Sequence, residues 1–134
     1  MLHMLDTDIA SYAIRGRASI KAKLSEMPQD DVCISVMTRA EMNYGLKKVP
    51  AESRLHLGVK AFLKVVRILP WDSEAADYYA EIRHQLEASR QQIGEIDMMI
   101  AAHSLSANAA LVTNNARHFN RIRAPLNIVT WLAE

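Results

Sequence analysis

Short apolar runs alternate along this chain with longer stretches whose apolar residues recur at helical spacing, and no other feature limits the fold more. Such runs are typical of strands that are buried on both faces. The predicted strands cover residues 2–5, 32–36, 67–69, 110–113 and 128–129. Because strands that alternate with helices form parallel sheets, we predict an α/β fold with a central parallel β-sheet flanked by α-helices.

The stretches between these runs predict the helices that cover the sheet. One stretch places Leu55, Val59 and Phe62 on a single face, as an amphipathic helix requires. The predicted helices cover residues 8–14, 17–26, 38–47, 52–66, a long segment that starts at Ser73, and 96–107. The sequence contains no repeat or low-complexity linker and its 134 residues suit one domain, so we predict a single domain over 1–134.

Composition and simple motifs exclude several classes of protein. Cys33 is the only cysteine, so neither an intrachain disulfide nor a thiolate zinc site can form. No Gly-rich phosphate loop occurs, and no apolar run approaches the ~20 residues of a membrane span. The apolar start of the chain is too short for a signal peptide, so we expect a cytoplasmic protein.

Four acidic residues stand beside apolar runs that fold inward, namely Asp6, Asp8, Glu41 and Asp97. Two carboxylates about 4 Å apart repel by roughly 4 kcal/mol at an effective dielectric near 20. A cluster of them therefore needs protons, basic partners or a metal cation. Hard oxygen ligands with few histidines indicate Mg²⁺ or Mn²⁺.

Each acid also has a modest structural explanation. Asp6 or Asp8 could cap the helix that follows, because aspartate is a good N-cap. Thr38 and Glu41 have the spacing of a capping box, and Asp97 could interact with the dipole of its own helix. A shared site remains the stronger interpretation for the whole set, since ligands bind outside the carboxyl ends of the strands in open α/β sheets.

Basic residues are concentrated in two stretches that contain no acid, 9–25 and 98–133. Basic patches around an acidic centre suit a phosphodiester substrate, although an ordinary solvated surface would look the same. The residues that we predict to bind substrate are Arg15, Arg39 and Arg117.

Four short motifs, taken together, carry a resemblance to a known family. They cover Leu5–Asp8, Thr38–Gly45, Gly94–His103 and Leu111–Phe119. Their order and separations resemble those of a PIN domain over essentially the whole chain, 1–134. The match is closest to VapC-type toxins, the ribonuclease half of type II toxin–antitoxin (VapBC) pairs.

This resemblance implies an endoribonuclease that depends on Mg²⁺ or Mn²⁺ and cuts RNA with a metal-activated water, in several relatives within a tRNA. It implies that the catalytic and metal-binding acids are Asp6, Glu41 and Asp97. It implies that the supporting polar residues are Thr7, Asp8, Thr113 and Asn115.

The last motif departs from the family pattern. The family commonly has a fourth acid just before the phenylalanine, where this chain has His118, and Asn115 is also uncharged. A second metal is therefore expected to bind weakly, or to be held mainly by RNA phosphate and water. The resemblance further implies a VapB-type antitoxin as partner, a homodimer and a toxin–antitoxin hetero-oligomer, with Ile9, Tyr12 and Ile14 as contacts.

Two other functions stay open from the sequence alone. Asp6 and Asp8 also resemble the paired aspartates of haloacid-dehalogenase-like phosphatases, in which the first is a nucleophile. The expected Gly-Thr pair and the late Asp-Asp pair are missing, which argues against that class. The second alternative is a non-catalytic interaction domain that uses its acidic cluster only to bind a metal.

Overall fold

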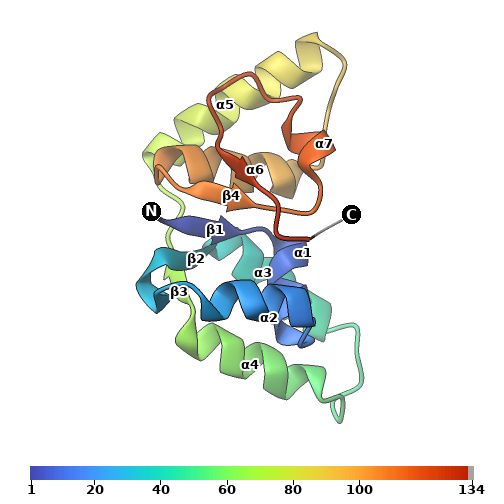
Figure 1. Cartoon of the computed structure of the whole chain (residues 1–134). Coiled ribbons are helices and arrows are strands. Elements are labelled where there is room, and N and C mark those ends of the chain that lie inside the picture. Colours follow the sequence, from blue (N-terminus) through green and yellow to red (C-terminus); the bar gives the residue numbers. More distant parts are fainter. Residues whose placement is uncertain (133–134) are drawn as a thin grey trace.

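The computed structural model of this protein describes residues 1–132, which form a five-stranded parallel sheet flanked by helices. The strand order is β3-β2-β1-β4-β5, and every neighbouring pair is parallel. Figure 1 shows β4, β1, β2 and β3 one below another, with α5 and α6 toward the top and α4 at the bottom. The strands are β1 (His3–Leu5), β2 (Val32–Ser35), β3 (Arg67–Leu69), β4 (Ala110–Val112) and β5 (Ile128–Val129). The predicted α/β fold with a central parallel sheet is confirmed.

The helices follow the predicted order, and their ends differ by a few residues. They are α1 (Thr7–Ile14), α2 (Ala18–Ser25), α3 (Val36–Leu46), α4 (Leu55–Val65), α5 (Ser73–Ala88), α6 (Glu95–Ser106) and α7 (Ala116–Phe119). The sequence did not predict α7 or the 3₁₀ helix η1 (Gln29–Asp31), because neither is long enough to show a helical period. None of the helices within residues 1–132 combines the length and the apolarity needed to cross a bilayer.

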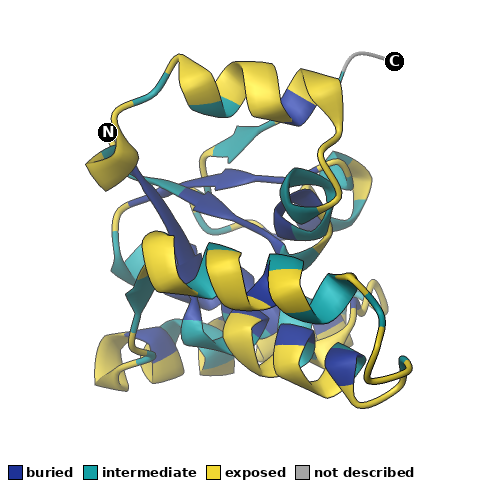
Figure 2. Cartoon of the chain, turned by 90° about the horizontal axis from the view of Figure 1, so that it is seen from below, coloured by how far each residue is buried: buried dark blue, intermediate teal, exposed yellow. Residues whose placement is uncertain are grey.

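Side chains of each strand alternate between two apolar cores. Met4 belongs to the core that α5 and α6 cover, and Leu5 belongs to the core that α1 to α4 cover. Leu111 and Val112 of β4 divide in the same way, because successive strand residues point to opposite faces. Figure 2 shows the strands buried between helices whose outer faces are exposed. The expectation that Ile9 contacts a partner is wrong, since Ile9 is fully buried in the second core.

The direction of winding reverses between β1 and β4. From β1 the chain adds β2 and β3 on one side, and then returns to add β4 and β5 on the other. Leu5 pairs with both Ile34 and Val112, so the carboxyl ends of the three central strands are level. In open α/β sheets, a crevice forms where two strands lead away in opposite directions. The fold therefore predicts a site beside the residues that follow β1 and β4.

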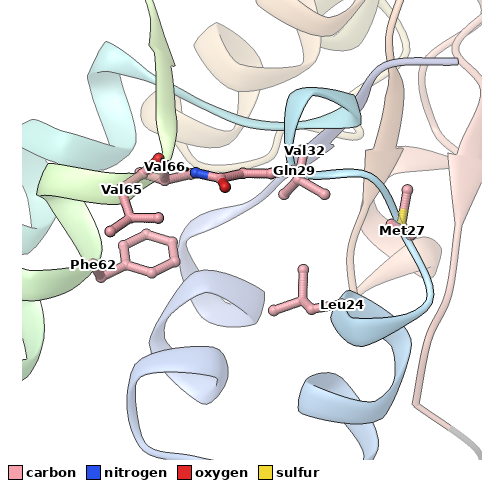
Figure 3. A pocket seen from close by; sticks show the side chains of 7 residues that line it. All are labelled: Leu24, Met27, Gln29, Val32, Phe62, Val65 and Val66. Carbon is pink, nitrogen blue, oxygen red and sulfur yellow. Dashed lines mark hydrogen bonds between the residues drawn. The ribbon is translucent and has the colours of Figure 1, made fainter.

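An apolar hollow of about 300 Å³ lies at the other ends of the strands (Figure 3). Val32 begins β2 and Val66 directly precedes β3, so both mark amino ends. Phe62 of α4 and Leu24 of α2 line the same hollow. Its polar side chain is Gln29, whose amide donates a hydrogen bond to the carbonyl of Val65 at 3.1 Å. This hollow shares no lining residue with the acidic site described next.

Candidate active site

Three acids from distant parts of the chain line one hollow of about 160 Å³. Asp6 follows β1, Glu41 lies in the second turn of α3, and Asp97 lies in the first turn of α6. The hollow lies at the winding reversal, because Asp6 is placed there by β1 and its N–H donates to the carbonyl of Val112 at 3.0 Å. The other lining residues are Thr7, Asp8, Asn115 and Phe119.

Asp6 is the most deeply buried of these acids, with 4% of its surface exposed. Its carboxylate caps α1 by accepting a hydrogen bond from the N–H of Ile9 at 2.9 Å, so the predicted N-cap is confirmed for Asp6. The nearby hydroxyl of Thr113 stabilises the charged carboxylate and lowers its pKa. Burial nevertheless raises the pKa of Asp6 to about 6, and the charges of Asp8 and Asp97 act in the same direction.

Glu41 is held by a threonine from another helix. The hydroxyl of Thr7 donates a hydrogen bond to Oε1 of Glu41 and lies 3.2 Å from the hydroxyl of Thr38. The predicted capping box is wrong, because Thr38 lies inside α3 and is fully buried. The N-cap of α3 is Ser35, whose hydroxyl accepts from the N–H of Met37 at 3.1 Å. Sequence spacing missed this role of Thr38 because its partner, Thr7, lies on a different helix.

Asp97 is half-buried and faces the other acids. Burial raises its pKa above the ordinary value, and the charges of Glu41 and Asp8 raise it further. The charge of His118 opposes this effect. Two carboxyl groups in this hollow, those of Asp6 and Asp97, thus resist ionisation unless positive charge is supplied.

Of the polar residues that follow β4, Asn115 lines the hollow and Thr113 lies beneath it. Thr113 is fully buried, and its hydroxyl accepts a hydrogen bond from the N–H of Asn115 at 2.9 Å. The side-chain amide of Asn115 donates to Nδ1 of His118 at 2.8 Å. Asn115 lines both the acidic hollow and a second cleft beside it, and His118 lines that cleft.

The three arginines predicted to bind substrate lie in different places. Arg117 lines the cleft that contains His118. Arg15 lines a largely apolar hollow between α1, α3 and α4, which shares Thr7 and Glu41 with the acidic hollow. Arg39 is exposed on α3. The sequence prediction omitted Arg17, which joins Arg117 in the cleft, although its place in an acid-free basic stretch was a usable signal.

The donor set suits a hard divalent cation, which prefers oxygen ligands. Burial, and after it the neighbouring carboxylates, raise the pKa values of Asp6 and Asp97, and a bound cation would oppose both effects. Within residues 1–132, no three acidic, histidine or cysteine side chains are already arranged as ligands of one ion. Residues of the right chemistry therefore line the hollow, and a bound cation would draw their carboxylates together.

Comparison with known proteins gives a consistent result. A PIN domain family model matches residues 3–125. The Rickettsia felis protein named Ribonuclease VapC2 is 34% identical over 124 residues, which are 91% of this chain and 92% of that protein. A Shigella flexneri protein named tRNA(fMet)-specific endonuclease VapC is 32% identical over 119 residues, covering 89% of this chain and 90% of its own length.

Two solved structures of toxin–antitoxin type have closely similar chains. VapBC2 from Rickettsia felis, bound to a DNA fragment from its promoter, matches with a TM-score of 0.90 and 32% identity over 98% of this chain and 100% of that one. DNA-bound VapBC from Salmonella typhimurium matches with a TM-score of 0.90 and 33% identity over the same shares. The family model and these relatives cover nearly the whole described fold, and they agree with the four sequence motifs. The chain therefore belongs to the PIN-domain family and, within it, to the VapC ribonucleases.

Proposed function

We propose that this protein is a metal-dependent endoribonuclease and acts as the toxin of a type II toxin–antitoxin pair. The observation that carries the proposal is the meeting of Asp6, Glu41 and Asp97 in one hollow at the winding reversal of a PIN-domain sheet. The names of the relatives support it, since they are ribonucleases and a tRNA(fMet)-specific endonuclease. We further propose that one PIN domain comprises the whole chain, 1–134, because β5 completes the sheet beyond residue 125.

Members of this family use divalent metal ions, and we propose Mg²⁺ or Mn²⁺ for this protein. Asp6 and Asp97 would hold the metal together with Glu41, because these carboxylates line the hollow. When bound, the ion supplies positive charge that activates water and stabilises the charge developing on the phosphodiester. Its oxygen ligands distinguish this site from the nitrogen and sulfur sites that favour zinc.

The remaining polar residues keep the acids in place. Thr7 orients Glu41 through their hydrogen bond, and Thr113 with the N–H of Ile9 orients Asp6. Asp8 is exposed at the rim and adds negative charge near Asp97. Asn115 adds a neutral amide where a further acid would increase the repulsion. These residues therefore support the metal-binding acids rather than replace them.

We propose that the substrate is RNA, with tRNA as the class to test first, in the cytoplasm. A VapB-type antitoxin is the proposed partner, because the similar solved chains belong to VapBC complexes. A homodimer within a toxin–antitoxin hetero-oligomer is the proposed assembly. Coexpression with the neighbouring small gene product, followed by measurement of the molar mass of the complex, tests both partner and assembly.

The function is tested by incubating the purified protein with a tRNA pool in Mg²⁺ or Mn²⁺ and in EDTA. Cleavage is expected only with metal, and Asp6→Asn and Asp97→Asn are each expected to reduce it at least about 100-fold. Asp30→Asn is the matched control, because Asp30 is exposed on η1 and lies outside the hollow. Wild-type cleavage by either active-site variant, or cleavage undiminished in EDTA, would contradict the proposal. A phosphoenzyme on Asp6 would instead support the phosphatase alternative.

A further inference from the structure

A polar cleft of about 840 Å³ adjoins the acidic hollow, and the proposed function does not account for it. Asn115 lines both spaces and so marks where they join. None of the described residues that line the cleft is acidic. Its charged and polar lining consists of Arg17, Asn114, Asn115, Arg117, His118 and Thr130.

The two arginines reach this cleft from opposite ends of the sequence. Arg17 lies between α1 and α2, and Arg117 lies on α7. Both are exposed. Among residues 1–132, Arg83 and Glu87 form the one ion pair shorter than 4 Å. No carboxylate of these residues is therefore paired with Arg17 or Arg117. As far as residues 1–132 are concerned, both guanidinium groups can therefore contact an anionic ligand.

Tyr12 fixes the position of Arg17 relative to the strand end. The guanidinium carbon of Arg17 lies 4.7 Å from the centre of the Tyr12 ring, a cation–π contact. The hydroxyl of the same tyrosine accepts a hydrogen bond from the side-chain amide of Asn114 at 3.2 Å. One aromatic ring thus joins a basic side chain to the loop after β4, which lowers the entropy cost of binding a ligand there.

RNA needs a positively charged surface beside the acidic hollow, and this cleft provides one. Carboxylates repel the phosphates of an approaching RNA strand, whereas arginine is suited to bind phosphate through paired donors. On the basis of the proposed ribonuclease function, we propose that the cleft binds the sugar–phosphate backbone of the RNA on one side of the cleaved bond. Arg17 and Arg117 contact its phosphates, and Asn115 lies where the strand passes into the acidic hollow.

The experiment measures binding without cleavage. Fluorescence anisotropy of a labelled single-stranded RNA of about 12 nucleotides is recorded in EDTA, over a series of salt concentrations. Each arginine that contacts a phosphate of a single strand adds about 0.7 to the slope of log affinity against log salt. Arg17→Ala and Arg117→Ala are each expected to lower that slope by about 0.7, which corresponds to about fivefold weaker binding near 0.1 M salt.

Matched variants separate this role from general charge and from folding. Arg67→Ala removes the same charge from an exposed residue of β3, the strand at the opposite edge of the sheet, and should leave affinity and slope unchanged. Arg117→Lys keeps the charge and should retain the slope. Tyr12→Leu, which removes the ring beneath Arg17, should weaken binding, whereas Tyr12→Phe should retain most of it. Thermal unfolding of each variant verifies the fold.

Parallel cleavage assays distinguish the two proposals. If the wild type cuts RNA but Arg17→Ala and Arg117→Ala retain its RNA affinity and salt slope, the cleft proposal is overturned and the ribonuclease stands. The cleft proposal is also overturned if these variants bind RNA normally but no longer bind the antitoxin, since the cleft would then bind a protein partner. If the wild type cuts no RNA with metal present, the ribonuclease proposal itself fails. Loss of slope in both cleft variants, with Arg67→Ala unchanged, supports the cleft as the phosphate site.

Discussion

The hydroxyl of Thr7 donates a hydrogen bond to the carboxylate of Glu41, and so joins the start of α1 to the middle of α3. Thr7 directly follows Asp6, so the contact sets the spacing between two of the proposed metal-binding acids. The hydroxyl of Thr38, 3.2 Å away, completes the arrangement from within α3. The acidic hollow is therefore held together by neutral hydroxyls as well as by the sheet.

Replacing Thr7 tests whether this bond orients Glu41. Thr7→Val keeps the shape of the side chain but removes the donor, with a cost to stability of about 1 kcal/mol. We expect RNA cleavage to fall about tenfold and to need more Mg²⁺ for half-maximal rate, because Glu41 would be less well placed. Thr7→Ser keeps the hydroxyl and should behave like the wild type. Equal metal dependence of the valine variant and the wild type would contradict this role.

The buried carboxyl of Asp6 predicts how stability of the metal-free protein depends on pH. Burial raises its pKa from 3.8 to about 6, so between these values the folded state holds a proton that the unfolded chain has released. Stability should therefore fall as pH rises from about 4 to 6, by about 3 kcal/mol in total. Urea unfolding in EDTA across this range measures the effect.

Asp6→Asn is the matched variant for this measurement. Its amide oxygen can still accept the hydrogen bond from the N–H of Ile9. The variant should lose the downward slope and be the more stable protein at pH 7, while Asp30→Asn keeps the wild-type slope. Mg²⁺ or Mn²⁺ should stabilise the wild type above pH 6 but not Asp6→Asn. An Asp6→Asn protein less stable than the wild type at pH 7 would show that burying the ionised carboxylate of Asp6 does not destabilise the fold.

Much of this architecture was predictable from the sequence because its causes are local. Apolar runs identify the strands, and a parallel sheet then brings the residues after β1 and β4 to one edge. The position of Asp97 was not predictable in this way, since α6 has no strand directly before it. The position of Asp97 depends on how α6 packs against the sheet. The resemblance to the PIN domain, not the spacing of the motifs, predicted that Asp97 joins the other acids.

The errors in the sequence analysis have the same origin. Thr38 and Glu41 have the spacing of a capping box, but the N-cap is Ser35 at the end of β2, three residues before Thr38. Ile9 follows a polar segment, yet it packs beneath β1 in the second core. The burial of Thr38 beside Thr7 and that of Ile9 in the second core both depend on residues distant in sequence, which no local pattern records.

Cys33 should be chemically inert in the folded protein. Burial in the middle of β2 raises the pKa of its thiol to about 12, so almost no thiolate exists at neutral pH. We expect no labelling by iodoacetamide at pH 8 in buffer and rapid labelling in urea. Cys33→Ala should retain cleavage activity, at a cost in stability from the small cavity. Labelling of the folded protein at the rate of a free thiol would contradict the burial of Cys33.

A buried bond between α6 and the start of α3 should also influence the active site. Nδ1 of His103 lies 2.7 Å from the hydroxyl of Ser35, and His103 is 2% exposed. Burial lowers the pKa of His103 below its ordinary value of 6.5, which the charge of Asp72 only partly offsets. The folded state therefore binds fewer protons than the unfolded chain, so stability is present above about pH 6.5 and is lost as pH falls below it.

The effect of His103 on the pH dependence of stability is opposite in sign to the effect of Asp6. Variants of the two residues separate these effects. In an Asp6→Asn background, stability should rise with pH up to about 6.5, and an added His103→Gln change should flatten that rise. Because His103 and Asp97 share α6 while Ser35 caps the helix of Glu41, loss of the bond should also loosen the spacing of the two acids. We therefore expect His103→Gln to require more Mg²⁺ for cleavage. Ser35→Ala should show the same metal dependence, and a His103→Gln protein with unaltered metal dependence would limit the bond to a role in stability.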